Sequence, residues 1–231
     1  CGLHDSNAAY YLYERKFNKT FTLISTGTWV VIFNKQMKID LLDENKEIFA
    51  KINVYGKLIP VIRFMGGREY SIIVKKCLNF IKTKKSIDYL FDKKVYAMPS
   101  FADGGPFKNI KGKIINKKLL RSRDDYISLA SLYVALLIDY CLKQIDSNNS
   151  IIIDGVFAKN KIFLYCLSVL RQNQRIFVSH ESNGTATGAF LLCNKGSNYK
   201  LNLEKLPKNI NQIILSYKEE WIKLIKKNIK D

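Results

Sequence analysis

Small residues gather in three turns where the sequence predicts that a strand ends, and α/β proteins commonly bind phosphates at such places. The first turn is Ser25-Thr26-Gly27-Thr28, between strands expected over residues 21–24 and 29–33. Its hydroxyls and unhindered backbone N–H groups are suited to wrapping a phosphate. A Ser/Thr/Gly hairpin is also an ordinary connection between two strands, so the turn alone is compatible with both interpretations.

The other two turns lead into expected helices. Residues 154–160 follow an apolar run at 150–154, which is typical of a strand buried on both faces. Gly66-Gly67-Arg68-Glu69 places a glycine pair at a helix start. An ordinary strand-to-helix turn, with Asn160 near the helix start, explains the first of these equally well. A tight turn, with an ion pair between Arg68 and Glu69, explains the second.

The elements that must position these turns alternate along the chain. Helical spacing and capping signals, and short apolar runs between turn residues, separate helices from strands. The order of strand, turn and helix near the end predicts an α/β fold with a partly parallel sheet. Helices are expected over residues 5–13, 124–144 and 161–170, from 185 and from about 215. Residues 63–80 are expected to become helical after the glycine pair, with Cys77, Leu78 and Ile81 continuing the helical spacing. Strands are expected over 48–54, 113–115, 150–154 and 175–178, and an ordered loop over 99–112.

Composition excludes several classes of protein. With 47% hydrophobic and 12% aromatic residues among 231, the chain has the apolar surface that disordered proteins lack. Only 12 Gly, 4 Pro and 5 Cys exclude collagen-like and disulfide-scaffold proteins. The formal net charge of +18 is spread through every segment, which favours a solvated basic surface. A nucleic-acid-binding protein is the lesser alternative, because it requires the cations to cluster on one face.

Cysteine usage and apolar runs predict a cytoplasmic protein with no membrane partner. The five cysteines are odd in number and form no CxxC pair, so we expect buried, reduced thiols. The first 12 residues lack the pattern of a signal peptide. The longest apolar stretch, residues 126–142, is shorter than the roughly 20 residues of a membrane span, so we expect a buried helix. A first residue that is Cys predicts a processed chain or a piece of a longer one.

The order of the motifs resembles the C-terminal domain of the FGGY carbohydrate kinases, especially rhamnulokinases and L-fuculokinases. The resemblance runs from Gly2 to about Cys193. The matching segments are Gly2-Leu3-His4-Asp5-Ser6 with G-x-H-D-[ST], residues 25–29 with S-T-G-T-W, residues 63–70 with a glycine-bearing helix start, residues 99–112 with a P-x-F…G…P…G loop, residues 154–160 with the G-G-G-x-x-x-N adenosine turn, and residues 181–189 with a closing E…A-x-G-A-A segment.

This resemblance implies one domain over residues 1–231, the actin-like (ribonuclease H-like) C-terminal lobe of a sugar kinase, with a mixed sheet flanked by helices. It assigns Asp5 the role of catalytic base on a sugar hydroxyl, with His4 beside it at the substrate. The residues alone favour Asp5 as a helix cap instead. Thr26 and Gly27 would hold ATP phosphates, and Gly67, Gly155 and Asn160 would line the nucleotide, with Mg²⁺ bridging the phosphates and no metal ligand assigned on the protein.

The sequence departs from the family in two ways. The family's glycines after the adenosine strand are only partly kept, because Asp154 and Val156 flank Gly155 and Phe157 follows, and this bulk predicts a reshaped adenine slot. Family members are about twice as long, and their N-terminal domain carries a second phosphate loop and most sugar-binding residues. We therefore expect ATP-dependent phosphorylation of a ketose or polyol hydroxyl, with an N-terminal domain as partner and no activity from this chain alone. The alternative is a non-catalytic or split nucleotide-binding lobe, and the sugar and oligomeric state, a homo-oligomer included, stay open.

Overall fold

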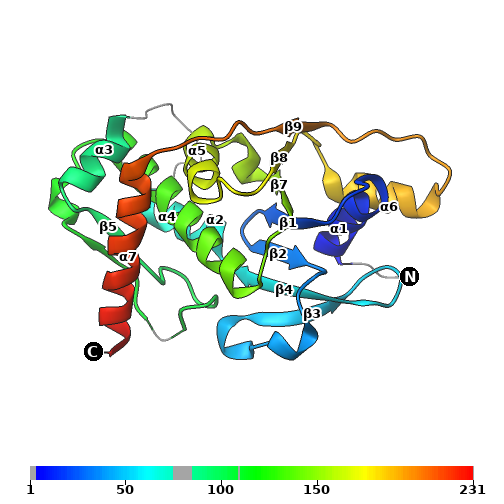
Figure 1. Cartoon of the computed structure of the whole chain (residues 1–231), viewed down its shortest axis with the longest axis horizontal. Helices are drawn as coiled ribbons and strands as arrows, with labels where there is room; N and C mark the ends of the chain where they lie inside the picture. The colour runs from blue at the N-terminus through cyan, green and yellow to red at the C-terminus, as the bar shows by residue number, and fades with distance from the viewer. Residues whose placement is uncertain (1–3, 75–84, 109, 231) are drawn as a thin grey trace.

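A seven-stranded mixed sheet forms the centre of the molecule, with helices on both faces (Figure 1). The computed structural model describes residues 4–74, 85–108 and 110–230. The strand order is β3 (Ile48–Ile52), β4 (Leu58–Phe64), β2 (Val30–Asn34), β1 (Phe21–Thr26), β7 (Ser150–Gly155), β8 (Ile176–Ser179) and β9 (Leu203–Lys205). A separate hairpin pairs β5 (Tyr96–Met98) with β6 (Lys113–Ile115).

Parallel pairing at the middle of the sheet brings two of the small-residue turns together. β7 is parallel to β1 on one side and to β8 on the other, and the remaining pairs are antiparallel. The register places Thr26 beside Gly155, so the carboxyl ends of β1 and β7 meet at one edge. The predicted mixed, partly parallel sheet is therefore confirmed, and it sets the first and second turns next to each other.

Alternation along the strands explains why both faces are covered. Leu23 of β1 and Ile152 of β7 face one side, and Ile24 and Ile153 face the other. Helices α1 (Asp5–Lys16) and α6 (Gly184–Cys193) pack on the first face, and α2 (Gly66–Val74), α4 (Arg123–Gln144) and α5 (Lys161–Leu170) on the second (Figure 1). Helices α3 (Lys85–Asp92) and α7 (Gln212–Lys230) extend this second layer around the β5–β6 hairpin.

A close backbone contact joins the two helices of the first face. The stripe of Gly184, Gly188 and Leu191 is the buried side of α6. A Cβ at Gly188 would lie 1.9 Å from the carbonyl oxygen of Ala8 in α1, so only glycine fits. Cys193 follows Leu191 by two residues, which places it on the opposite side of the helix, and it is exposed. The prediction that all cysteines are buried is therefore wrong for Cys193.

The remaining described cysteines and the long apolar helix agree with the predictions. Cys141 and Cys166 are buried free thiols, whereas Cys1 and Cys77 lie outside the described residues. Helix α4 begins with a capping box between Ser122 and Asp125. It is long and apolar enough to cross a membrane, but 89% of its most apolar stretch is buried inside the molecule, as expected for a core helix.

Four elements have no counterpart among the predictions: β4, α3, β5 and β9. Pro60 in β4 lacks a backbone N–H and argues against a strand, yet it pairs with Ala50 of β3. β5 and β9 have three residues each, too few to show an alternating pattern. Helix α7 begins at Gln212, three residues before the predicted start. The expected continuation of α2 with Cys77, Leu78 and Ile81 lies outside the described residues.

Candidate active site

A cavity of about 400 Å³ opens at the carboxyl end of β1, beside the N-termini of α1 and α6. Its walls come from α1, β1, β2, β3, β4 and α6 and from the turn between β1 and β2. The lining residues are His4, Asp5, Ser6, Ser25, Thr26, Gly27, Thr28, Trp29, Val31, Lys51, Arg63 and Thr185. The structure therefore brings together four of the predicted site residues, namely His4, Asp5, Thr26 and Gly27.

Asp5 presents its carboxylate to this cavity from the first position of α1. The residue that caps the helix is His4, whose side chain accepts a hydrogen bond from the N–H of Ser6. His4 Nδ1 also lies 2.6 Å from Oδ1 of Asp5, and the Asp5 side chain is 75% exposed. His4, not Asp5, is therefore the N-cap residue, although Asp5 Oδ1 also accepts from the N–H of Ser6 (2.5 Å). Its carboxylate complements the positive end of the helix and remains accessible to a ligand in the cavity.

Thr26 lies on the cavity wall, but its hydroxyl joins two strand ends. It donates to the carbonyl oxygen of Asp154 (2.6 Å) and accepts from the N–H of Phe157 (3.0 Å). The N–H of Gly27 donates across the turn to the carbonyl oxygen of Trp29. The donors expected to meet phosphate at these two positions are thus already engaged. Within the described part of the chain, the hydroxyls of Ser25 and Thr28 make no hydrogen bond and are the open donors of the turn.

Gly67 and Gly155 hold the same turn by close backbone contact. A Cβ at Gly67 would lie 2.2 Å from the carbonyl oxygen of Gly27, and one at Gly155 would lie 2.0 Å from that of Thr26. Gly155 also has a φ of +90°, which side chains with a Cβ rarely adopt. Neither glycine lines the cavity. The second and third turns therefore fix the shape of the first one.

Asn160 lies away from the cavity and is fully buried. Its Oδ1 accepts from the N–H of Phe163, which caps α5, and its Nδ2 donates to Ser131 Oγ (2.9 Å). Because both ends of the amide are engaged, its placement does not support the predicted contact with ATP. The alternative, an ordinary capped helix start, describes its side chain.

The two bulky residues of the second turn differ in burial. Phe157 is fully buried and packs edge-on against Tyr70 and at a tilt against Phe163. Val156 is 42% exposed. Only Val156 therefore adds bulk at the surface where the sequence predicts a reshaped adenine slot.

Glu69, which the sequence left unassigned, turns into the core instead of pairing with Arg68. It is 1% exposed and accepts hydrogen bonds from the Tyr133 hydroxyl and the N–H of Phe101. Burial raises the pKa of this carboxyl, and the hydrogen bonds from Tyr133, Phe101 and Ser100 partly offset the rise. Glu69 thus ties the loop over residues 99–112 to α2 and α4.

Asp154, at the end of β7, is a second buried carboxylate. Its Oδ1 accepts from the N–H of Gly155, and a Cβ at Gly184 would lie 2.8 Å from its Oδ2. Burial raises its pKa, whereas hydrogen bonds from Tyr13 and Gly155 lower it. It does not line the cavity, so Asp5 is the sole acidic side chain among the lining residues.

Lys51 of β3 and Arg63 of β4 line the cavity and were not among the predicted site residues. The Lys51 ammonium donates to Ser6 Oγ (2.6 Å). The Arg63 guanidinium lies 4.8 Å from the ring centre of Trp29 and 4.9 Å from that of Phe49. Lys51 lies on an expected strand, and the residues around it in the sequence do not show that its side chain reaches the N-terminus of α1. Finding these residues required the register of β3 and β4.

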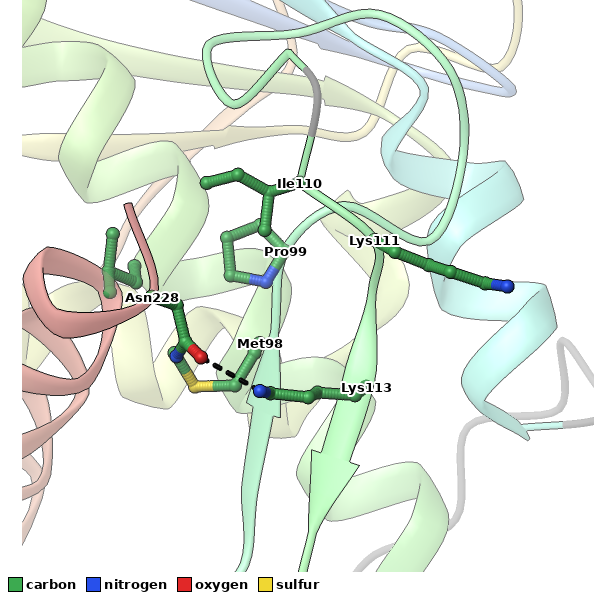
Figure 2. Close-up of a pocket in the computed structure, with 7 residues that line it drawn as sticks. Met98, Pro99, Ile110, Lys111, Lys113 and Asn228 are labelled. Atoms are coloured by element: carbon green, nitrogen blue, oxygen red, sulfur yellow. Dashed lines mark hydrogen bonds between the residues drawn. The ribbon is translucent and has the colours of Figure 1, made fainter. Parts of the chain in front are cut away.

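A second cavity, of about 210 Å³, lies between the β5–β6 hairpin and the C-terminal part of α7 (Figure 2). Lys113 donates to Asn228 Oδ1 across it (2.7 Å), and Lys111 points away from the other labelled residues. Met98, Pro99 and Ile110 form its apolar wall. This cavity has no carboxylate in its lining and contains none of the predicted site residues.

The polar side chains of the first cavity suit a metal ion that is coordinated mainly by a bound nucleotide and by water. Among the described residues, no cluster of three His, Cys, Asp or Glu side chains is placed to hold an ion. Mg²⁺ bound to ATP needs few protein ligands, because phosphate oxygens and waters fill most of its octahedral shell. Asp5 and the open hydroxyls of the turn fit that requirement.

Comparison with known proteins identifies the family. Residues 18–200 match the family described as carbohydrate kinase FGGY, C-terminal domain, so the chain belongs to the FGGY carbohydrate kinases. The fold is the actin-like, ribonuclease H-like ATPase fold of these domains, as predicted. No curated protein matches the chain. The narrower likeness to rhamnulokinases and L-fuculokinases stays a prediction.

Solved structures agree with this assignment. A carbohydrate kinase from Novosphingobium aromaticivorans is similar with a TM-score of 0.83 and 25% identity over 97% of this chain and 51% of that one. A xylulose kinase from Rhodospirillum rubrum matches with a TM-score of 0.70 and 15% identity over 98% and 50%. A glycerol kinase from Plasmodium falciparum, solved with ADP, matches with a TM-score of 0.63 and 15% identity over 97% and 50%. The chain thus spans about half the length of these proteins.

Proposed function

We propose that the chain provides one wall of the active site of an ATP-dependent sugar kinase. The observation that supports this most is the shared cavity, in which the Asp5 carboxylate faces the turn of Ser25 and Thr28. A kinase needs an acceptor hydroxyl next to a carboxylate and phosphates next to hydrogen-bond donors. The second wall and most sugar contacts would come from an N-terminal domain, which agrees with the half-length coverage of the solved kinases.

In this mechanism Asp5 acts as the general base. Its carboxylate accepts a hydrogen bond from the attacking sugar hydroxyl, orients it toward the γ-phosphorus of ATP, and takes its proton as the new bond forms. His4, whose Nδ1 lies 2.6 Å from Asp5 Oδ1, packs beside the carboxylate at the substrate position. Ser25 and Thr28 donate to phosphate oxygens, and bound Mg²⁺ would neutralise part of the phosphate charge.

The environment of the cavity is suited to a phosphorylated ligand. The N-termini of α1 and α6 both border it, through Asp5 and Thr185, and helix N-termini attract anions. We propose a ketose or polyol as acceptor and the cytoplasm as the compartment, in keeping with the free thiols of Cys141, Cys166 and Cys193.

The test is turnover by the full-length product of the gene with ATP, Mg²⁺ and a panel of ketoses and polyols. Asp5→Asn removes the base but keeps the shape, and we expect kcat to fall about 10²- to 10⁴-fold. Asp40→Asn is the matched control, because Asp40 is exposed and does not line the cavity. Titration of each variant with Mg²⁺–ATP shows whether nucleotide binding is retained.

The alternative of a non-catalytic nucleotide-binding lobe gives a different result. The wild-type protein would then bind Mg²⁺–ATP without phosphorylating any member of the panel, and Asp5→Asn would change nothing. That outcome would overturn the proposed kinase activity.

A further inference from the structure

Lys51 reaches the cavity from the edge of the sheet and contacts the N-terminus of α1. Its ammonium donates to Ser6 Oγ (2.6 Å), Ser6 Oγ lies 2.9 Å from His4 Nδ1, and that atom lies 2.6 Å from the Asp5 carboxylate. Lys51 is therefore linked to the candidate base through two side chains. Within the described residues it forms no ion pair, so its charge is not neutralised by a carboxylate in direct contact.

Arg63 is held rigidly on the neighbouring strand. Its guanidinium lies over the rings of Trp29 and Phe49, and its Nε donates to Glu47 Oε2 (2.9 Å). The two Nη atoms make no hydrogen bond among the described residues. An arginine fixed by stacking and by one ion pair keeps a planar pair of donors free for an oxyanion.

The charges around the two cations leave an excess of positive potential in the cavity. Burial lowers the pKa of Lys51, the Asp5 carboxylate raises it, and Arg63 lowers it further, so the three groups are within electrostatic reach of one another. The other acidic contact is Glu47, which is shared between Arg63 and Lys108. Two helix N-termini add to the cations. An anion bound beside Asp5 would offset this excess.

We infer that Lys51 and Arg63 form an oxyanion subsite that binds the phosphoryl group while it passes from ATP to the hydroxyl held by Asp5. The inference rests on the proposed function. The hydroxyl oxygen that Asp5 activates becomes bonded to phosphorus, so cations linked to Asp5 face the equatorial oxygens of that phosphorus. A carboxylate on an acidic sugar is the other anion that would fit this chemistry.

The step is balanced without any further reactant. The bond between the γ-phosphorus and the β,γ-bridging oxygen breaks, and its electron pair leaves with ADP. A new bond forms between phosphorus and the sugar oxygen, whose proton passes to Asp5. Lys51 and Arg63 remain charged throughout and stabilise the negative charge that is spread over the three equatorial oxygens.

The experiment uses the full-length protein with a sugar that it phosphorylates, and compares Lys51→Gln, Arg63→Gln and Lys57→Gln. Lys57 is the matched control, because it is exposed on the same β3–β4 hairpin and does not line the cavity. We expect Lys51→Gln and Arg63→Gln each to lower kcat about 10²- to 10³-fold. The KM for a neutral sugar should stay within about threefold. Lys57→Gln should match the wild type.

Binding supplies a readout that does not depend on turnover. Orthovanadate, titrated in the presence of Mg²⁺–ADP and sugar, is a probe of the phosphoryl position, and we expect its Kd to rise at least tenfold in both cavity variants. Lys51→Arg keeps the charge and should recover part of the kcat lost in Lys51→Gln. Circular dichroism and thermal unfolding confirm that each variant is folded.

Two results would overturn the subsite. One is an unchanged kcat and vanadate affinity in both glutamine variants. The other is an effect confined to acidic sugars, with a raised KM for an aldonate and normal turnover of neutral sugars. Either result leaves an active wild-type enzyme, whereas failure of the proposed function leaves a wild type that turns over no sugar, so the two failures are distinguishable.

Discussion

The cavity at Asp5 and the cavity beside α7 differ in how they are built. The cavity at Asp5 is formed where several elements end, and its central turn is held by Thr26 and by two glycines in backbone contact. The cavity in Figure 2 lies between a hairpin and the surface helix α7 and is spanned by one exposed hydrogen bond from Lys113 to Asn228. The cavity at Asp5 therefore combines a turn fixed by backbone contacts with an accessible carboxylate, whereas the lining of the cavity beside α7 contains no carboxylate.

The largest effect on stability is expected from Gly155→Ala. The new Cβ would lie 2.0 Å from the carbonyl oxygen of Thr26, at a φ of +90°. With ψ at −153°, this backbone conformation is essentially restricted to glycine. We expect unfolding free energy to fall by about 3 kcal/mol or more, measured by urea denaturation. Gly196→Ala is the control, because nothing lies within 4 Å of its Cβ position. Equal stability of the two variants would show that the turn is not clamped.

Thr26→Val and Thr28→Val distinguish a hydroxyl that stabilises the turn from a hydroxyl that is proposed to bind phosphate. The Thr26 hydroxyl is buried with two hydrogen bonds, so Thr26→Val should cost about 1–3 kcal/mol of unfolding free energy. Thr28 is exposed, and Thr28→Val should stay within about 0.5 kcal/mol of the wild type. Thr28→Val should instead raise the KM for ATP about tenfold in the full-length enzyme. An unchanged KM would remove Thr28 from the proposed phosphate contacts.

Glu69 predicts a pH dependence of stability for the loop that borders the second cavity. Its pKa is raised by burial, so the folded state retains the proton at higher pH than the unfolded chain does. Its contribution to stability is therefore complete below its ordinary pKa and is lost as pH rises through the raised value. Each unit of that rise corresponds to about 1.4 kcal/mol. Glu69→Gln, a neutral mimic, should lack this loss when urea denaturation is compared between pH 4 and pH 8. The same pH profile in both proteins would contradict the prediction.

The smallest effect is expected from Lys113→Gln in the second cavity. The Lys113–Asn228 hydrogen bond is exposed, so its removal should change unfolding free energy by less than about 0.5 kcal/mol. We expect kcat and the KM for ATP to equal those of the wild type. A loss of turnover comparable to that of Asp5→Asn would end the distinction between the two cavities.

Sequence reasoning identified the turns but not all of their partners. The resemblance to the FGGY family predicted the fold and grouped Asp5, Thr26 and Gly27 at one site. Strand-end reasoning applies to Thr26 and Gly27, because the end of β1 lies beside the end of β7. It did not reveal that the Thr26 hydroxyl bonds to Asp154, since this contact depends on the register between β1 and β7. Lys51 and Arg63 were missed for a similar reason. Their position beside α1 follows from the pairing of β3 with β4, and β4 itself was hidden by Pro60.

The glycine contact between α1 and α6 has a consequence for domain closure. Gly188 seats α6 directly on the Ala8 carbonyl, and the Thr185 hydroxyl donates to the carbonyl of Asp5 (3.4 Å). With no side chain between them, the two helices have no room to slide, so their starting residues keep a constant spacing. If the proposed N-terminal domain closes over the cavity, Asp5 and Thr185 keep fixed positions in the wall that it approaches. The movement of closure then belongs to that other domain.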